Sequence, residues 1–165
     1  MSIDKALFRQ VAGSFASGVT VITTGAEGKF HGMTASAFTS LSIDPTLVLV
    51  CVDRNAQTFE ALHAAGRFNV NILAGDQEHL SRTFASKDSP HAHGLVGIDY
   101  TLGELGLPVL DGALAFLECR VKEELEGGDH IIFVGEVDNA GIGEIEAPLL
   151  YFRGRYRTVG ELPIA

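Results

Sequence analysis

The stretch at residues 32–45, which reads GMTASAFTSLSIDP, decides how the rest of the chain is interpreted. Six of its fourteen residues are Ser, Thr or Asp, and no long charged side chain interrupts it. Successive side chains of a strand point to opposite faces, so an unbulged strand would align four hydroxyls on one face: Thr34, Ser36, Ser40 and Ser42. This hydroxyl rail predicts hydrogen bonds to a flat ligand close to the backbone. The alternative is a half-exposed strand whose hydroxyls face water.

The length and composition indicate one soluble, acidic domain. A chain of 165 residues buries roughly two-thirds of its unfolded surface, so a single domain is expected over residues 1–165. No apolar run could cross a bilayer, and residues 1–10 lack the apolar core of a signal peptide, which favours a cytoplasmic protein. The net charge of −9 argues against nucleic acid and anionic membranes as partners. Cys51 and Cys119 lie in apolar segments without CxxC spacing, so a disulfide framework is not expected.

Short strands dominate the expected secondary structure. Segments rich in β-branched or alternating apolar residues predict strands at residues 18–24, from 30 onward, and at 47–52, 68–73, 113–126, 131–139 and 149–158. Helices are predicted at residues 4–14, 55–65 and 76–85, with an irregular loop at 86–100. The run LVLVCV at 47–52 is expected to be covered on both faces. The pattern favours a mainly β fold, a closed antiparallel barrel with peripheral α-helices, over a doubly wound parallel sheet.

Motifs of the common nucleotide-binding folds are absent from the sequence. No GxGxxG follows a predicted strand, and no GxxxxGK[ST] occurs. Asp53-Arg54-Asn55 follows a buried strand at a predicted helix start, where free amide groups and a guanidinium could bind a phosphate. The alternative there is an ordinary capped helix. Ser86-Lys87-Asp88 is a weaker candidate for an anion contact.

Two predicted turns carry further candidates. In Gly127-Gly128-Asp129-His130 a tight hairpin turn explains the glycines but neither Asp129 nor His130. Residues 151–157 (YFRGRYR) interleave aromatic and basic side chains, as expected for stacking on a ring and pairing with a pyrophosphate, or for a strand with solvated arginines. His91 and His93 form an HxH pair without further ligands nearby in sequence, so a metal site is not predicted. No spacing indicates a catalytic triad.

Taken together, six blocks resemble a known family. They occur in the order FASGVTVITT, GMTASAFTSLSIDPTLVLVCV, FNVNIL, LSRTFAS, GGDHIIFVGEV and PLLYFRGRY, between about residues 8 and 156. This series resembles the short-chain NAD(P)H:flavin oxidoreductases, the reductase components of two-component flavin-dependent monooxygenases. The resemblance implies a split β-barrel with a Greek-key core, of the FMN-binding type, that works as a homodimer.

The resemblance also implies two sets of site residues. Flavin, FMN or FAD, is expected to contact Met33, Thr34, Ala35, Ser36, Ser40, Leu41, Ser42, Cys51, Val52, Asp53, Arg54, Asn55, Thr58, Phe84, Ala85, Ser86 and Lys87. The nicotinamide nucleotide is expected to contact His130, Tyr151, Phe152, Arg153, Gly154 and Arg155. This chain has Asp53 and Arg54 where family members often carry Asn or Ser.

The function implied is reduction of flavin by NADH or NADPH, with hydride transfer from the nicotinamide to flavin N5, to supply reduced flavin to a partner monooxygenase. Hydride transfer is the cofactors' own chemistry, so no side chain is expected to act as acid, base or nucleophile. One alternative is a non-catalytic split barrel that binds or carries flavin. Another is a flavoprotein with its own substrate, similar to pyridoxamine-phosphate oxidase, which the lack of a basic cluster for a phosphorylated substrate disfavours.

Overall fold

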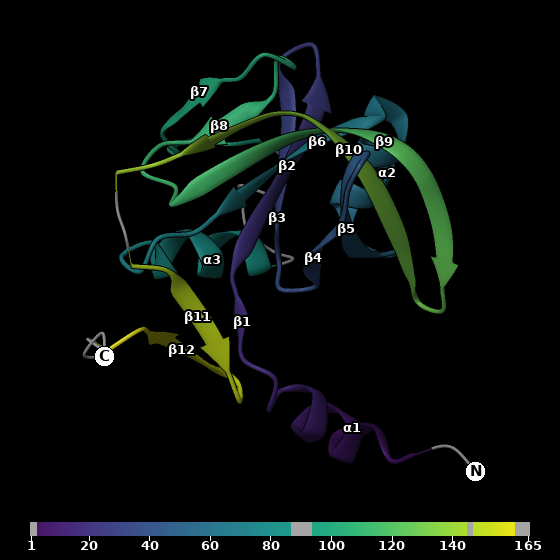
Figure 1. Ribbon diagram of the computed structural model, residues 1–165, viewed down its shortest axis with the longest axis vertical. Coiled ribbons are helices and arrows are strands. Elements are labelled where there is room, and N and C mark those ends of the chain that lie inside the picture. Colours follow the sequence, from purple (N-terminus) through teal and green to yellow (C-terminus); the bar gives the residue numbers. More distant parts are fainter. Residues whose placement is uncertain (1–2, 87–93, 145–146, 161–165) are drawn as a thin grey trace.

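The computed structural model describes residues 3–86, 94–144 and 147–160, and this part of the chain is mainly β (Figure 1). Its largest sheet has seven strands, all antiparallel to their neighbours, in the order β3-β2-β6-β9-β10-β5-β4. In chain order the strands are β2 (Thr20–Ala26), β3 (Lys29–Ala35), β4 (Phe38–Ile43), β5 (Thr46–Asp53), β6 (Arg67–Ile72), β9 (Ala115–Gly127) and β10 (His130–Ile142).

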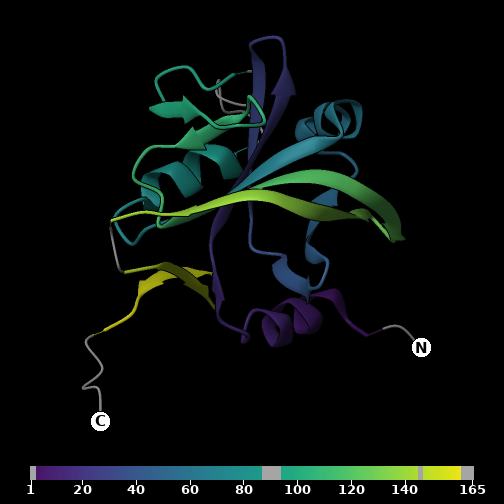
Figure 2. The ribbon, with the colours of Figure 1, turned by 45° about the horizontal axis from the view of Figure 1, so that its top comes forward.

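Two small sheets are separate from this main sheet. A three-stranded sheet joins β1 (Ser17–Gly18), β11 (Leu149–Phe152) and β12 (Arg155–Thr158) in the order β1-β11-β12. It lies near the helix α1 (Figures 1 and 2). A hairpin of β7 (Tyr100–Leu102) and β8 (Pro108–Leu110) lies on the other side of the molecule. The sequence did not predict β7 and β8, because three-residue strands leave little periodicity to recognise.

Three helices accompany the strands in the described part of the chain. They are α1 (Lys5–Ala12), α2 (Gln57–Ala65) and α3 (Glu78–Ala85). Asp4 caps α1 as predicted, because its Oδ1 accepts from Leu7 N–H at 2.9 Å. None of these helices is long and apolar enough to cross a membrane. Both α2 and α3 pack against β2 and β3, whereas α1 stands away from the body and has no buried residue (Figures 1 and 2).

The prediction that Asn55 caps the second helix is wrong. The cap position is Ala56, and its side chain makes no capping hydrogen bond. The Asn55 N–H instead donates to Asp53 Oδ1 at 2.8 Å, which forms a local turn before the helix. The other end is as predicted: Gly66, with φ 62°, terminates α2 in the left-handed conformation.

The hydrophobic core forms two clusters. One lies against the main sheet and includes Val50, Phe68 and Phe133. The other lies under α3 and includes Val21 and Phe84. Burial of one such large apolar side chain stabilises the fold by about 1.5–3 kcal/mol.

Residues 32–45 do not form one strand, so the prediction of a continuous hydroxyl rail is wrong. The stretch divides into β3 and β4, which lie at opposite ends of the sheet order. A register shift between Ser40 and Ser42 also places a β-bulge at Leu41. A break and a bulge each change which face a side chain occupies, so Thr34 and Ser42 do not share a face by simple alternation.

The strand β5 is buried on one face rather than on both. Val48, Val50 and Val52 are buried, whereas Leu47, Leu49 and Cys51 between them are half-buried. The expectation of cover on both faces is therefore wrong for the chain taken by itself. An unbroken apolar run does not reveal how much of its second face is covered.

Candidate active site

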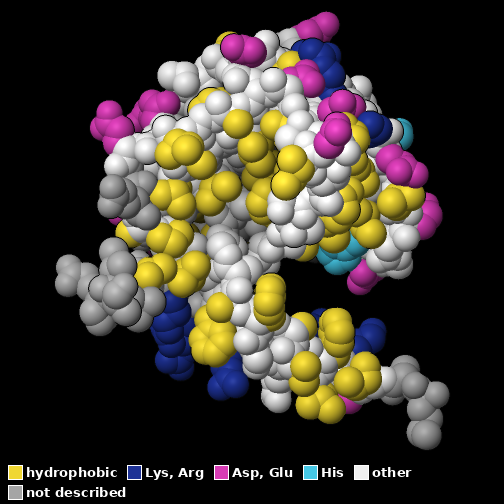
Figure 3. All heavy atoms as spheres, in the orientation of Figure 1, with side chains coloured by type: hydrophobic (Ala, Val, Ile, Leu, Met, Phe, Trp, Pro, Cys, Tyr) yellow, Lys and Arg dark blue, Asp and Glu magenta, His cyan; other side chains and the backbone are white. Residues whose placement is uncertain are grey.

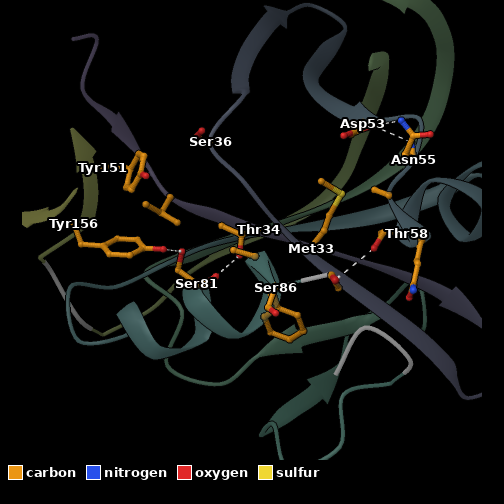
Figure 4. Close-up of a pocket in the computed structure, with 16 residues that line it drawn as sticks. Met33, Thr34, Ser36, Asp53, Asn55, Thr58, Ser81, Ser86, Tyr151 and Tyr156 are labelled. Atoms are coloured by element: carbon orange, nitrogen blue, oxygen red, sulfur yellow. Dashed lines mark hydrogen bonds between the residues drawn. The ribbon is translucent and has the colours of Figure 1, made fainter. Parts of the chain in front are cut away.

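A pocket of about 380 Å³ lies between the edge strand β3, the start of α2, the helix α3 and the β11–β12 hairpin (Figure 4). This volume falls in the range of small-molecule sites. The pocket is lined by Val19, Gly32, Met33, Thr34, Ser36, Asp53, Asn55, Ala56, Gln57, Thr58, Ser81, Phe84, Ala85, Ser86, Tyr151 and Tyr156.

One wall of the pocket is the free edge of β3. The Leu73 N–H donates to Val19 O at 2.9 Å, so odd-numbered residues along β2 direct their main-chain groups toward β6. The even-numbered residues of β2 therefore bond to β3, where their partners include Met33 and Ala35. The residues between these partners direct their N–H and C=O groups away from the sheet.

Gly32 and Thr34 are the residues whose main-chain groups point off this edge. The Thr58 hydroxyl donates to Gly32 O at 3.4 Å, which agrees with that direction. Both residues line the pocket. Main-chain N–H and C=O groups of β3 are thus available to the polar edge of a flat ligand.

The hydroxyl groups on this wall have a different role from the one predicted. The Thr34 hydroxyl donates its proton to Ser81 O at 2.6 Å, and the Thr58 hydroxyl donates to Gly32 O. A hydroxyl has one proton, so both groups can only accept a hydrogen bond from a ligand. The donors of this wall are main-chain N–H groups rather than the Thr34 hydroxyl.

The first turn of α2 forms the polar end of the pocket. Ala56, Gln57 and Thr58 line it, and the cap residue Ala56 makes no side-chain capping hydrogen bond. The N–H groups and the positive end of the helix dipole favour an anionic group such as a phosphate. Asp53 lies at the same end and adds a negative charge that opposes this preference.

Arg54 is directed away from the pocket. Its Nε donates to Gly128 O at 3.1 Å, and its guanidinium pairs with Glu126. The Arg54 N–H also donates to Asp129 O at 3.1 Å. These contacts attach the loop before α2 to the β9–β10 hairpin, so Arg54 does not line the pocket.

The opposite end of the pocket is aromatic. Tyr151 and Tyr156 meet edge to face with ring centroids 5.3 Å apart. Phe84 lies directly against Gly32, where an added Cβ would come within 2.5 Å of the phenyl ring. The absence of a side chain at Gly32 therefore lets Phe84 form part of the pocket wall.

Ten of the predicted flavin and nicotinamide residues lie together in this pocket. They are Met33, Thr34, Ser36, Asp53, Asn55, Thr58, Phe84, Ala85, Ser86 and Tyr151. Six of them belong to the sequence blocks GMTAS and LSRTFAS, which supply parts of β3 and α3.

The other predicted flavin residues lie elsewhere in the chain. Ala35 is buried in the core, Ser40, Leu41 and Ser42 belong to β4, and Cys51 and Val52 belong to β5. Burial raises the pKa of the Cys51 thiol, which keeps it protonated. Lys87 lies outside the described residues.

Among the predicted nicotinamide residues, only Tyr151 lines this pocket. His130 begins β10 opposite Asp53, and its Nδ1 lies 2.7 Å from Asp129 Oδ1, which lowers the pKa of the Asp129 carboxyl. Phe152 and Arg155 flank the β11–β12 turn, which contains Arg153 and Gly154.

That turn is directed toward the end of α1. The Arg153 N–H donates to Gly13 O at 2.8 Å, and Arg153 Nε donates to Ser14 Oγ at 3.2 Å. The guanidinium of Arg153 thus lies near α1 rather than in the pocket wall.

Six lining residues were absent from the predicted site set: Val19, Gly32, Ala56, Gln57, Ser81 and Tyr156. Tyr156 belongs to the aromatic and basic segment that the sequence singled out, and Gly32 begins the central stretch, so both carried a signal. Ser81 belongs to the block LSRTFAS, but its role depends on the packing of α3 against β3, which the sequence does not reveal.

The pocket indicates a class of protein: a mainly β domain with a site suited to a planar ligand that bears an anionic group. The family model described as "Flavin reductase like domain" matches residues 12–160, so the chain belongs to this family. It is 46% identical over 154 residues to the reductase component of a 4-nitrophenol 4-monooxygenase/4-nitrocatechol 2-monooxygenase from Rhodococcus opacus, covering 93% of this chain and 80% of that protein.

Two further similarities concern proteins of Streptomyces globisporus. The chain is 41% identical to an NADH-dependent FAD reductase, over 93% of this chain and 85% of that protein. It also matches a solved NADH:FAD oxidoreductase in complex with NAD and FAD fragments, with a TM-score of 0.88, 40% identity, and coverage of 98% of this chain and 95% of that one.

Proposed function

We propose that this protein is a flavin reductase, which uses NADH to reduce FAD or FMN and supplies the reduced flavin to a partner monooxygenase. The observation that carries the proposal is the pocket on the free edge of β3, in a chain that belongs to the flavin reductase family. Its relatives include a monooxygenase reductase component and an NADH-dependent FAD reductase.

The residues of the pocket fit a flavin. The main-chain groups of Gly32 and Thr34 match the alternating N–H and C=O groups on the polar edge of the isoalloxazine ring. The uncapped start of α2 suits its phosphate. When bound, the flavin accepts a hydride from the nicotinamide, chemistry that the cofactors supply themselves.

The role of this chain is therefore to bind and to orient. The β3 edge and Phe84 fix the plane of the ring, and Tyr151 and Tyr156 offer an aromatic surface for a second ring. Holding two reactants in the correct orientation at contact distance accounts for much of the rate acceleration of a two-substrate reaction. We propose that the nicotinamide nucleotide contacts Tyr151, the neighbouring residues 152–155, and His130.

The proposal includes a split β-barrel as the detailed fold. The connection between β3 and β4 has two residues, Ser36 and Ala37, yet the two strands lie at opposite ends of the sheet order. The outer strands of a flat sheet of seven would be about 29 Å apart. Three residue steps span at most about 11 Å, so the sheet has to curl until its ends approach each other. Contacts between β3 and β5, which lie near opposite ends of the sheet order, support this closure.

The proposal also includes a homodimer. The helix α1 carries Leu7, Phe8 and Val11 at exposures of 50%, 58% and 63%. Figure 3 shows apolar side chains on α1 and on the part of the body that faces it across a hollow. A second copy of the chain would bury this apolar helix face, which is costly to leave in water.

Anaerobic mixing with one equivalent of FAD or FMN and excess NADH tests the function. We expect the visible absorbance of the flavin to bleach rapidly, and the comparison with NADPH to define the preferred donor. Tight binding without bleaching would identify a flavin carrier instead of a reductase. Absence of both binding and bleaching would refute the assignment of the pocket to flavin.

A further inference from the structure

Three pocket residues from three different elements form a chain of hydrogen bonds (Figure 4). The Thr34 hydroxyl on β3 donates to Ser81 O on α3 at 2.6 Å. The Ser81 hydroxyl lies 2.8 Å from the hydroxyl of Tyr156 on β12. Ser81 is completely buried, so its hydroxyl depends on Tyr156 for a hydrogen bond.

The ring of Tyr156 is held firmly from two sides. The Arg82 guanidinium lies 4.8 Å from the ring centroid, and Arg82 itself is paired with Glu78 one turn earlier at 2.6 Å. The edge-to-face contact with Tyr151 holds another side of the ring. A ring held in this way fixes the position of its hydroxyl, and therefore the position of Ser81.

We propose that Tyr156 is a positioning residue of the flavin pocket, an inference that rests on the proposed function. By binding the Ser81 hydroxyl, Tyr156 holds the turn of α3 whose carbonyl takes the Thr34 proton. Thr34 is thereby kept as an acceptor on the pocket wall and cannot donate.

This arrangement predicts a preference between the two forms of the ligand. Reduction of flavin adds an N–H group to the ring, so a wall that accepts hydrogen bonds binds the reduced form better than a wall that can also donate. If Ser81 is released from Tyr156, Thr34 regains the freedom to donate, and the preference for reduced flavin decreases.

The test uses Tyr156→Phe in the full chain, with Tyr100→Phe as the matched control. Both tyrosines pack against the same apolar cluster, but Tyr100 lies outside the pocket and its hydroxyl has no hydrogen-bond partner within the described residues. The dissociation constants of oxidised and of reduced FAD are measured for each variant, the latter without oxygen. Kinetics provide kcat and the KM for flavin.

For Tyr156→Phe we expect the ratio of the two dissociation constants to shift about three- to tenfold toward oxidised flavin, the effect of one hydrogen bond. The KM for flavin should rise more than kcat falls, and Tyr100→Phe should match the wild type. Ser81→Ala should reproduce the shift, and the double variant should be no worse than the stronger single variant, because the same bond is lost once.

Two results would overturn the inference while leaving the proposed function intact. One is a Tyr156→Phe variant that behaves like Tyr100→Phe. The other is an equal loss of affinity for both flavin forms, which indicates that the hydroxyl only stabilises the fold. A wild-type protein that neither binds nor reduces flavin would instead refute the proposed function itself.

Discussion

Gly32 determines how closely α3 approaches the pocket wall. Its main-chain oxygen accepts from Thr58, and the Phe84 ring occupies the space where a side chain would otherwise lie. One residue therefore brings α2, α3 and β3 together at the pocket. A glycine is required here for space rather than for an unusual backbone conformation, because its φ is not positive.

Gly32→Ala should therefore weaken flavin binding. The new Cβ would lie 2.5 Å from Phe84 Cε1, so the ring has to move. We expect a stability loss of about 1–3 kcal/mol, as for other overpacked sites, and at least a tenfold rise in the flavin dissociation constant. Gly18→Ala is the control, because a Cβ at Gly18 meets nothing within 4 Å. Equal flavin affinities of the two variants would show that Phe84 does not shape the pocket.

The two cysteines should be poor nucleophiles in the native protein. Burial, with Asp138 and Glu118 nearby, raises the pKa of Cys119 to about 12, and burial raises the pKa of Cys51. The thiolate is the reactive form, so at pH 8 both thiols should alkylate much more slowly than a free cysteine, whose pKa is about 8.5. Mass spectrometry after iodoacetamide treatment, with and without denaturant, checks this. Rapid labelling of Cys119 in the folded protein would contradict it.

At the scale of elements, the edge position of β3 determines which groups meet the ligand. Main-chain groups of Thr34 point off the sheet, whereas those of Met33 bond to β2. Proline is tolerated on an edge strand where its missing N–H faces outward. This difference permits a main-chain donor to be removed without disrupting the sheet.

Thr34→Pro, compared with Thr34→Val, tests the main-chain donor. Thr34→Val removes only the hydroxyl, while Thr34→Pro also removes the N–H. We expect Thr34→Pro to bind flavin a further three- to tenfold more weakly, about one hydrogen bond. Met33→Pro is the contrasting variant, since it removes a ladder bond and should lower stability by about 1–3 kcal/mol. Equal flavin affinities for the two Thr34 variants would exclude this N–H as a ligand donor.

The elements that sequence predicted well are those with a local signal. The Asp4 cap, the Gly66 helix end and the β-branched run before Gly25 each identify their element by short-range chemistry. The break after Ala35 carries no Gly or Pro signal, and the bulge at Leu41 depends on pairing with β5. Both arise from tertiary structure, so the hydroxyl rail could not be tested from the sequence alone.

The same reasoning separates the predicted site residues. Predicted residues at the start of α2 and in the LSRTFAS helix do line the pocket, because each segment forms a compact local element next to β3. Ser40 and Ser42 lie past the break and the bulge, so their alternation with Thr34 is lost. Ser81 and Tyr156 meet only after chain segments 75 residues apart have packed together.

At the scale of the whole molecule, α1 is difficult to explain in a single chain. Leu7, Phe8 and Val11 lie along one side of this helix by their spacing, and none of its residues is buried. An isolated helix of eight residues is marginal in water, so packing against another surface has to stabilise it. A second copy of the chain is the occupant that the proposed homodimer supplies.

Phe8→Glu should therefore convert the dimer into a monomer without unfolding the chain. Phe8 is 58% exposed in the single chain, so the substitution costs little within it, but it would place a charge in the buried interface. Arg9→Glu is the control: it changes the charge by more, yet Arg9 is not three or four residues from Leu7, Phe8 or Val11, so helical spacing puts it on another side of α1. Sedimentation at several protein concentrations should show a monomer for Phe8→Glu and a dimer for Arg9→Glu. Among the described residues, none of those that line the pocket belongs to α1. A monomer that still binds flavin would therefore locate the interface on α1, whereas an unchanged dimer would place the interface elsewhere on the molecule.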